Sequence, residues 1–165
     1  MVETASSAKI TLPSDEQILI TREFDAPKHL VYRAWTTPEL VKRWWAGHRG
    51  TTTEVEMDLR PGGRWRYVIK ANAGFEVAFH GEYREIVPDE KLVFTEMFEG
   101  ADPLPDADVP VDTVTFSTLE DDRTVVHLLT QTTSKALRDM ILESGMEAGM
   151  QEQMNLIEEL ANSLR

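Results

Sequence analysis

Apolar residues near the end of the chain fall on two different faces of a helix, and no other pattern constrains the fold as strongly. Within residues 134–165, one face holds Leu137, Met140, Ile141, Ser144 and Ala148. The other face holds Met146, Met150, Met154, Ile157, Ala161 and Leu164. One straight helix cannot bury both faces against a single core. The pattern therefore predicts a short helix over residues 136–143 and a long helix over residues 145–164.

The expected break lies in the sequence Ser144-Gly145-Met146-Glu147, which is typical of a capping box. In this interpretation Ser144 caps the long helix and Glu147 reaches back to it from the first turn. A helix of about twenty residues is about 30 Å long, which suits the central support of a domain. Gly149, inside this helix, predicts the close approach of another segment.

The middle of the chain predicts strands, because apolar and polar residues alternate there. A first strand over residues 17–24 is followed by two short helices, over residues 27–35 and 38–46. Further strands are expected over residues 54–59, 64–70, 75–86, 92–98, 112–119 and 123–132. Strands and helices that are kept apart along the chain indicate the α+β class.

The strands have one apolar face, which must be covered, and only the C-terminal helix is long enough to cover it. We therefore expect a curved antiparallel sheet of about six strands wrapped around that helix, with the two short helices closing one end. The chain length suits one domain, which we place over residues 17–165. Residues 1–16 lack periodicity and are expected to form a disordered tail.

Large aromatic and methionine side chains gather on the predicted inner face. Such an interior either packs solid or holds an apolar ligand. Methionines spaced four residues apart can line a pocket or simply fill a core, because their side chains adapt to irregular shapes. The candidate ligand-binding residues are Trp44, Trp45, Met57, Trp65, Tyr67, Phe79, Phe94, Phe116, Met146, Met150 and Met154.

Candidate catalytic residues are few, since the sequence has no Gly-rich phosphate loop, nucleophile elbow or metal-spaced cluster. Glu96 shares a face with Phe94. If that face is buried without a cation, the pKa of Glu96 would be raised, and it could serve as a general acid or a ligand anchor. Alternatively, Glu96 lies in water at the cavity mouth or faces outward. His127 is a second weak candidate whose direction the alternation leaves open, whereas His80 is expected to face outward.

Charge and composition exclude several classes of function. The chain has 17 basic and 29 acidic residues and no cysteine, which argues against nucleic-acid binding and excludes disulfides and thiolate chemistry. We predict no metal, no cofactor, no membrane segment and a cytoplasmic location. The acidic, proline-rich segment 99–110 is expected to be either a mobile lid or an ordinary long loop. Its charge should favour neutral or cationic ligands over fatty acids.

Four phrases of the sequence resemble the bacterial branch of the family named for the activator of heat-shock protein 90 ATPase, homologue 1-like. They are REFDAPKHLVYRAWTTPELVKRWW, DLRPGGRWRYV, HGEYREIVPDEKLVFTE and SKALRDMILESGMEAGMQEQMNLIEEL. This family belongs to the START-like SRPBCC helix-grip superfamily. The resemblance implies a curved sheet that grips a C-terminal helix, with a cavity between them. It supplies no catalytic residues, and its matching positions are structural ones such as Pro27, Gly81 and Gly145.

The function expected from these observations is non-enzymatic binding of a small apolar or aromatic ligand between the sheet and the helix. One alternative, implied by the resemblance, is a co-chaperone or protein-interaction module whose partner is a chaperone ATPase, with a role in the stress response. Another is an acid–base enzyme similar to polyketide cyclases, because the superfamily includes such enzymes. We expect the protein to be a monomer or a weak homodimer.

Overall fold

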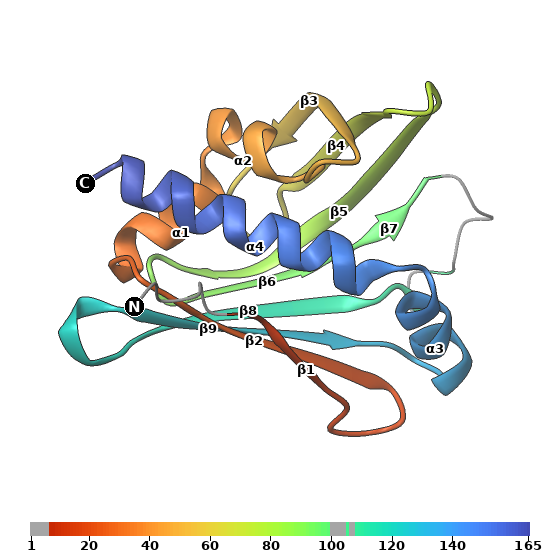
Figure 1. The fold of residues 1–165 in the computed structure, drawn as a ribbon. Helices are drawn as coiled ribbons and strands as arrows, with labels where there is room; N and C mark the ends of the chain where they lie inside the picture. The colour runs from red at the N-terminus through yellow and green to blue at the C-terminus, as the bar shows by residue number, and fades with distance from the viewer. Residues whose placement is uncertain (1–6, 100–104, 106–107) are drawn as a thin grey trace.

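A curved antiparallel sheet dominates the computed structural model, which describes residues 7–99, 105 and 108–165 (Figure 1). Its strands are β1 (Lys9–Thr11), β2 (Gln17–Phe24), β3 (Gly50–Met57), β4 (Arg64–Ala71), β5 (Glu76–Val87), β6 (Lys91–Thr95), β7 (Met97–Phe98), β8 (Val111–Thr118) and β9 (Thr124–Gln131). The helices are α1 (Lys28–Thr36), α2 (Pro38–Trp44), α3 (Lys135–Glu143) and α4 (Met146–Ser163), with a short 3-10 turn over Glu120–Asp122.

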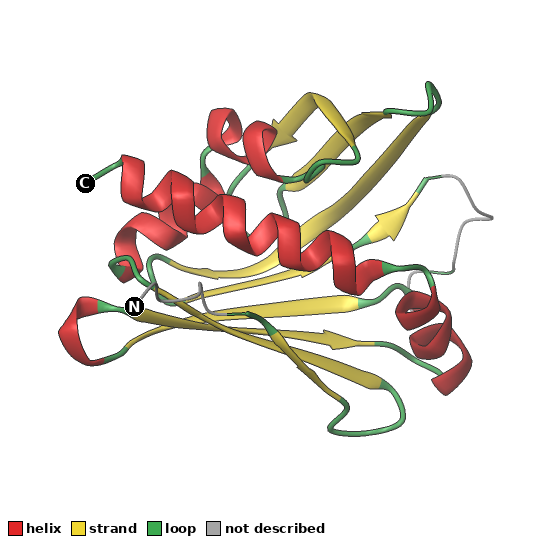
Figure 2. Cartoon of the chain, in the orientation of Figure 1, coloured by secondary structure: helices red, strands yellow, loops and turns green. Residues whose placement is uncertain are grey.

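The strand order across the sheet is β1-β2-β9-β8-β6-β5-β4-β3, and β7 pairs with β5 beside this path. Helix α4 runs across the concave face of the sheet, with α1 and α2 near its C-terminal end and α3 at its N-terminal end (Figures 1 and 2). The α+β helix-grip architecture predicted from the sequence is therefore confirmed. None of the helices in the described part of the chain is long and apolar enough to cross a membrane.

The break between α3 and α4 lies where the sequence predicted it, but the capping differs. Gly145 is the N-cap of α4 with φ of 83°, a left-handed conformation that glycine adopts without steric cost. Ser144 instead ends α3, and its Oγ donates a hydrogen bond to the Ile141 carbonyl at 2.6 Å. The predicted capping box is thus wrong, because the left-handed turn at Gly145 ends one helix and starts the next. The predicted division into two helices is nevertheless correct, and Met150, Met154 and Ile157 on the predicted inner face of α4 are buried.

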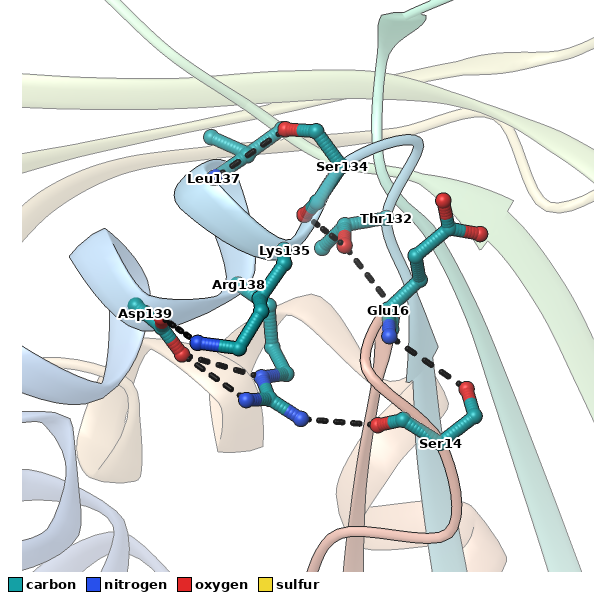
Figure 3. A network of polar contacts seen from close by, with 8 residues as sticks. All are labelled: Ser14, Glu16, Thr132, Ser134, Lys135, Leu137, Arg138 and Asp139. Carbon is teal, nitrogen blue, oxygen red and sulfur yellow. Dashed lines mark hydrogen bonds and ion pairs between the residues drawn. The ribbon is translucent and has the colours of Figure 1, made fainter.

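The predicted disordered tail over residues 1–16 contains an ordered strand. Strand β1 pairs with β2 between Lys9 and Thr21, whereas residues 1–6 lie outside the described residues. The turn after β1 is tied to α3, because buried Arg138 donates to the Ser14 carbonyl at 2.7 Å (Figure 3). Ser134 caps α3 by accepting from the Leu137 backbone N–H. A three-residue strand is too short for its alternation to be recognised in a sequence.

The predicted strand over residues 92–98 is divided in two at Glu96. Strand β6 pairs with the second half of β5, and β7 pairs with Phe79 and His80 in its first half. Gly81 lies between these two halves, where a Cβ atom would be 1.7 Å from the Thr95 carbonyl oxygen. The backbone of Thr95 therefore approaches Gly81 closely, and Glu96 lies at a break in the ladder.

Candidate functional site

The wedge formed by α1 and α2 meets the sheet in a cluster of aromatic side chains. The cluster encloses a cavity of about 20 Å³. A cavity of this size holds about one water molecule, whereas pockets for small ligands start at about 300 Å³. The interior is therefore nearly filled. Its walls are Trp35, Trp44, Trp45, Trp65, Tyr67, Tyr83, Leu92 and Phe94.

Trp45 is the centre of this cluster. Its ring packs against Tyr67 at a centroid distance of 4.8 Å and against Trp44 at 5.6 Å. It also meets Trp65 at 6.0 Å and Phe79 at 5.8 Å. Edge-to-face and tilted contacts of this kind stabilise a core beyond the area they bury. Trp45 is nevertheless only partly buried, whereas Trp44 and Trp65 are buried.

The sequence-predicted ligand residues divide into two groups. Five of them, Trp44, Trp45, Trp65, Tyr67 and Phe94, line the cavity. The others lie elsewhere in the core or against it: Met57, Phe79, Phe116, Met146, Met150 and Met154. Sequence reasoning missed three wall residues, Trp35, Tyr83 and Leu92. Tyr83 shares a strand face with Phe79, and Leu92 shares one with Phe94, so the alternation contained the signal for these two. Trp35 lies on α1, from which no residue was chosen.

The tyrosines place two hydroxyl groups beside the aromatic rings. The hydroxyl groups of Tyr67 and Tyr83 lie close enough for each to influence the pKa of the other. Burial raises the pKa of Tyr67 well above its ordinary value, and the neighbouring Tyr83 and Glu96 raise it further. Burial likewise raises the pKa of Tyr83, to about 12. Both hydroxyls therefore remain protonated at neutral pH and can act as donors or acceptors for a polar group in the cavity.

A pair of carboxyl groups adjoins this region. Asp112, only 5% exposed, lies on the inner face of β8 with Val114 and Phe116. The Thr130 hydroxyl donates to Asp112 Oδ1 at 2.6 Å, and the Glu96 carboxyl group hydrogen-bonds to Asp112 as well. Such a bond between two acids requires a proton on one of them. The two side chains thus form a proton-sharing pair.

Burial determines how this pair ionises. Burial, together with the charge of Asp112, raises the pKa of Glu96 well above its ordinary value. Burial raises the pKa of Asp112 too, but the bonds from Glu96 and Thr130 oppose that effect. Glu96 is therefore the acid that keeps the proton and donates it to the Asp112 carboxylate. Among the described residues, neither acid forms an ion pair with a lysine, arginine or histidine.

The sheet register connects the acid pair to the cavity. Ladder partners form a row across the inner face in the order Ile18, Thr130, Asp112, Phe94 and Tyr83. Side chains of directly opposed residues stand side by side on one face. Asp112 therefore lies next to Phe94, a wall of the cavity. Sequence reasoning missed Asp112, although it has the same parity as Val114 and Phe116.

The two histidines that the sequence singled out lie away from this pair. His127 alternates with the inner-face residues Val126 and Leu128, so it points to the outer face of the sheet. His80 also lies outside, as predicted, where its Nδ1 is 2.7 Å from Glu99 Oε2. Arg66 donates two hydrogen bonds to the same carboxylate, which lower the pKa of Glu99. No group of three potential metal ligands comes together in the part of the chain that the structure describes.

A second charged residue lies on the inner face, and sequence reasoning missed it as well. Arg22 of β2 lies on the same face as Ile18, Ile20 and Phe24, and its side chain is fully buried. Its Nη2 atom is 3.4 Å from Glu158 Oε2 of α4, and its guanidinium lies 4.9 Å from the centre of the Phe24 ring. No hydrogen-bond partner is found for its three side-chain nitrogens within the described residues. Burial lowers the pKa of Arg22, an effect that Glu158 opposes.

Comparison with known proteins agrees with this architecture. A family model described as "Activator of Hsp90 ATPase homolog 1-like protein" matches residues 25–162. The chain belongs to this family. Family membership accounts for the helix-grip arrangement of the sheet and α4. No curated protein sequence gives a significant match.

Several solved bacterial structures share the fold of this family member. A protein from Rhodobacter sphaeroides superposes with a TM-score of 0.84 at 20% identity, over 96% of this chain and 99% of its own. A Mycobacterium smegmatis protein has a TM-score of 0.81 at 25% identity, with coverage of 93% and 96%. A Chromobacterium violaceum protein has a TM-score of 0.73 at 26% identity, with coverage of 87% and 96%. These likenesses support the fold, and none of the three names a ligand.

Proposed function

We propose that the protein binds a small apolar or aromatic ligand between the sheet and α4 and does not transform it. The observation that carries this proposal is the cavity, whose walls are aromatic except for Leu92. Ligand sites are typically apolar and aromatic with a few placed polar groups, and the Tyr67 and Tyr83 hydroxyls are groups of that kind. Family membership supports the proposal, since it suggests a helix-grip fold that binds ligands.

The small volume of the cavity means that a ligand must displace a side chain. Trp45 is the best candidate, because it lines the cavity and is only partly buried. It follows the end of α2, in a segment that polar contacts hold against α4. Gln153 Nε2 donates to the Trp45 carbonyl, and the His48 backbone N–H donates to Glu152 Oε1 at 2.9 Å. Water can replace such partly exposed bonds at small net cost, so this segment can move more easily than the core.

Thermal shift with neutral aromatic compounds tests the proposal. We expect benzyl alcohol, phenethyl alcohol or naphthol to raise Tm, because a ligand that binds only the folded state stabilises it by about 2.7 kcal/mol at a hundredfold excess over Kd. Tryptophan emission should shift in the same titration, since Trp45 leaves its aromatic neighbours. Trp45→Ala should bind the same compounds more tightly, because its cavity is already open.

Phe75→Ala is the matched control, since Phe75 is 59% exposed and lies outside the cavity walls. This variant should bind the compounds as the wild-type protein does. If neither the wild-type protein nor Trp45→Ala shows a change in Tm or emission with any of the compounds, the cavity is not a ligand site and the proposal is wrong.

A protein-interaction role is the second candidate function, because the interior is nearly filled. In addition, Phe75 is 59% exposed and Phe98 is 43% exposed. Aromatic side chains are enriched in protein–protein interfaces. The family name suggests a chaperone ATPase as the partner. In this case the protein should stimulate ATP turnover by an Hsp90-type chaperone, and Phe75→Ser with Phe98→Ser should abolish the effect while Trp45→Ala preserves it. No stimulation by the wild-type protein would exclude this candidate.

A further inference from the structure

The acid pair formed by Glu96 and Asp112 has the features of a recognition group rather than of a packing element. Buried acids in stable cores are normally paired with cations. Asp112 is buried and Glu96 is half-buried, and within the described part of the chain the pair has only the hydrogen bond from Thr130 and the one between its own members. Replacing such acids with apolar residues of similar volume often leaves stability unchanged or improves it. The pair thus adds a charge that no cation of the described residues compensates.

The position of the pair supplies an independent argument. Asp112 stands beside Phe94 on the sheet, and Glu96 lies close enough to Tyr67 to influence the pKa of its hydroxyl. Both Phe94 and Tyr67 are walls of the aromatic cavity, together with Trp65. Faces of tryptophan and tyrosine rings attract cations through their quadrupoles. The negative charge of Asp112 therefore lies beside one wall of the aromatic cavity, and the charge and the rings favour the same class of ligand.

We propose that the Glu96–Asp112 pair binds the protonated amine of an arylalkylamine whose ring occupies the aromatic cavity. The proposal rests on the function proposed above and names the ligand class for that site. The ammonium group would donate to the Asp112 carboxylate while Glu96 remains its neighbouring donor. The formal net charge of −12 would favour the approach of a cation.

The test compares three compounds that share a skeleton but differ in charge: phenethylamine, phenethyl alcohol and phenylacetate. Their affinities for the wild-type protein are measured by calorimetry at neutral pH. We expect the amine to bind at least about tenfold more tightly than the alcohol, a difference of about 1.4 kcal/mol. Phenylacetate should bind most weakly, because its carboxylate meets the charge of Asp112.

Two variants locate the source of this preference. The double variant Glu96→Gln with Asp112→Asn removes the charge at the site, and the ratio of amine to alcohol affinity should fall to about one while alcohol affinity is kept. Glu96→Gln alone should keep the preference, because glutamine resembles the protonated acid and leaves the Asp112 charge in place. The matched control is Glu120→Gln with Asp121→Asn, which removes two acids from an exposed turn. It should keep the wild-type ratio.

The outcomes separate the two proposals. If the alcohol binds but the amine has no advantage in the wild-type protein, the inference about the acid pair is wrong and the cavity proposal stands. An amine preference that survives in the double variant also overturns the inference, because the charge then lies elsewhere. If none of the three compounds binds, both proposals fail. If the double variant does not fold, Asp112→Asn alone takes its place, because Asp112 carries the charge, and its ratio of amine to alcohol affinity should likewise fall to about one.

Discussion

Each of the two ends of the space beneath α4 contains a buried charged residue. The two residues differ in whether an oppositely charged side chain lies beside them. At the end near the C-terminus of α4, Arg22 is fully buried and Glu158 lies opposite it at 3.4 Å. At the other end, Asp112 is buried beside Glu96 and has hydrogen bonds, but no cation among the described residues pairs with it. The first arrangement neutralises the charge with a residue of the fold itself. The second leaves a negative charge next to an aromatic cavity, which is how a site differs from a structural ion pair.

The largest expected effect comes from a substitution that disrupts the close approach of β5 and β6, next to Glu96 and Asp112. Gly81→Ala would place a Cβ atom 1.7 Å from the Thr95 carbonyl oxygen and 2.6 Å from the Trp65 indole nitrogen. Because backbone must move to relieve this clash, we expect a loss of more than about 3 kcal/mol in the free energy of unfolding. Urea denaturation measures it. Gly149→Ala is the control, since its Cβ would meet Arg49 at an ordinary 3.7 Å. Equal stability of Gly81→Ala and wild type would contradict the account.

The second-largest expected effect comes from a substitution that removes the counter-charge of Arg22. Glu158→Gln leaves Arg22 buried without its counter-charge, while the amide oxygen can still accept from the Asp25 backbone N–H as Glu158 Oε1 does at 2.8 Å. Breaking a buried pair costs about 3 to 5 kcal/mol, and we expect about 2 kcal/mol here because Glu158 is partly exposed. Arg22→Met should cost less than Glu158→Gln, because it removes the buried charge itself. The opposite order would show that Glu158 does not compensate Arg22.

A third prediction sharpens the comparison through pH. The folded protein holds a proton on Glu96 above the ordinary pKa of 4.5, so it binds more protons than the unfolded chain over that range. The contribution of Glu96 to stability is therefore fully present below pH 4.5 and is lost as pH rises through the raised pKa, by at most about 1.4 kcal/mol per pH unit. Glu96→Gln should lack this decline. Thermal denaturation across this range measures the slope, and identical slopes for the two proteins would refute the assignment of the proton to Glu96.

The smallest expected effect concerns an exposed ion pair, which serves as the comparison for the buried Arg22–Glu158 pair. Arg123 Nη1 lies 3.2 Å from Glu23 Oε1, and both side chains are exposed. Arg123→Gln should change the free energy of unfolding by less than about 1 kcal/mol, because water screens exposed pairs. Urea denaturation alongside Glu158→Gln makes the comparison. A loss as large as that of Glu158→Gln would mean that burial is not what distinguishes the two pairs.

Sequence patterns could predict the architecture because burial repeats along each element. The two-faced pattern of residues 134–165 located the break at Gly145, and the one-sided strands required a covering helix. Details that depend on contacts between distant segments were not predictable in this way. The left-handed N-cap at Gly145 replaced the expected capping box, and β1 depends on pairing with β2 rather than on its own pattern.

The candidate site was predictable only in part. Its aromatic walls follow the apolar alternation, which identified residues such as Trp65 and Tyr67. The alternation also assigns Asp112 and Arg22 to the inner face, but polar residues at such positions look like exceptions until their partners are known. How far side chains fill a cavity depends on packing in three dimensions, so the choice between a solid interior and an open one was beyond the sequence. The expected lid over residues 99–110 lies largely outside the described residues.

The most direct measurement of the contrast between the two ends is a titration of the Glu96 and Asp112 carboxyl carbons by NMR, in the free protein and with phenethylamine. We predict that the pair titrates in two steps, both above the ordinary range of the two acids, since burial raises the pKa of both. Addition of the amine should shift both carboxyl resonances. If the two acids lose their protons near their ordinary pKa values of 4.5 and 3.8, and the amine leaves their signals unchanged, the account of this end as a charged recognition site is wrong.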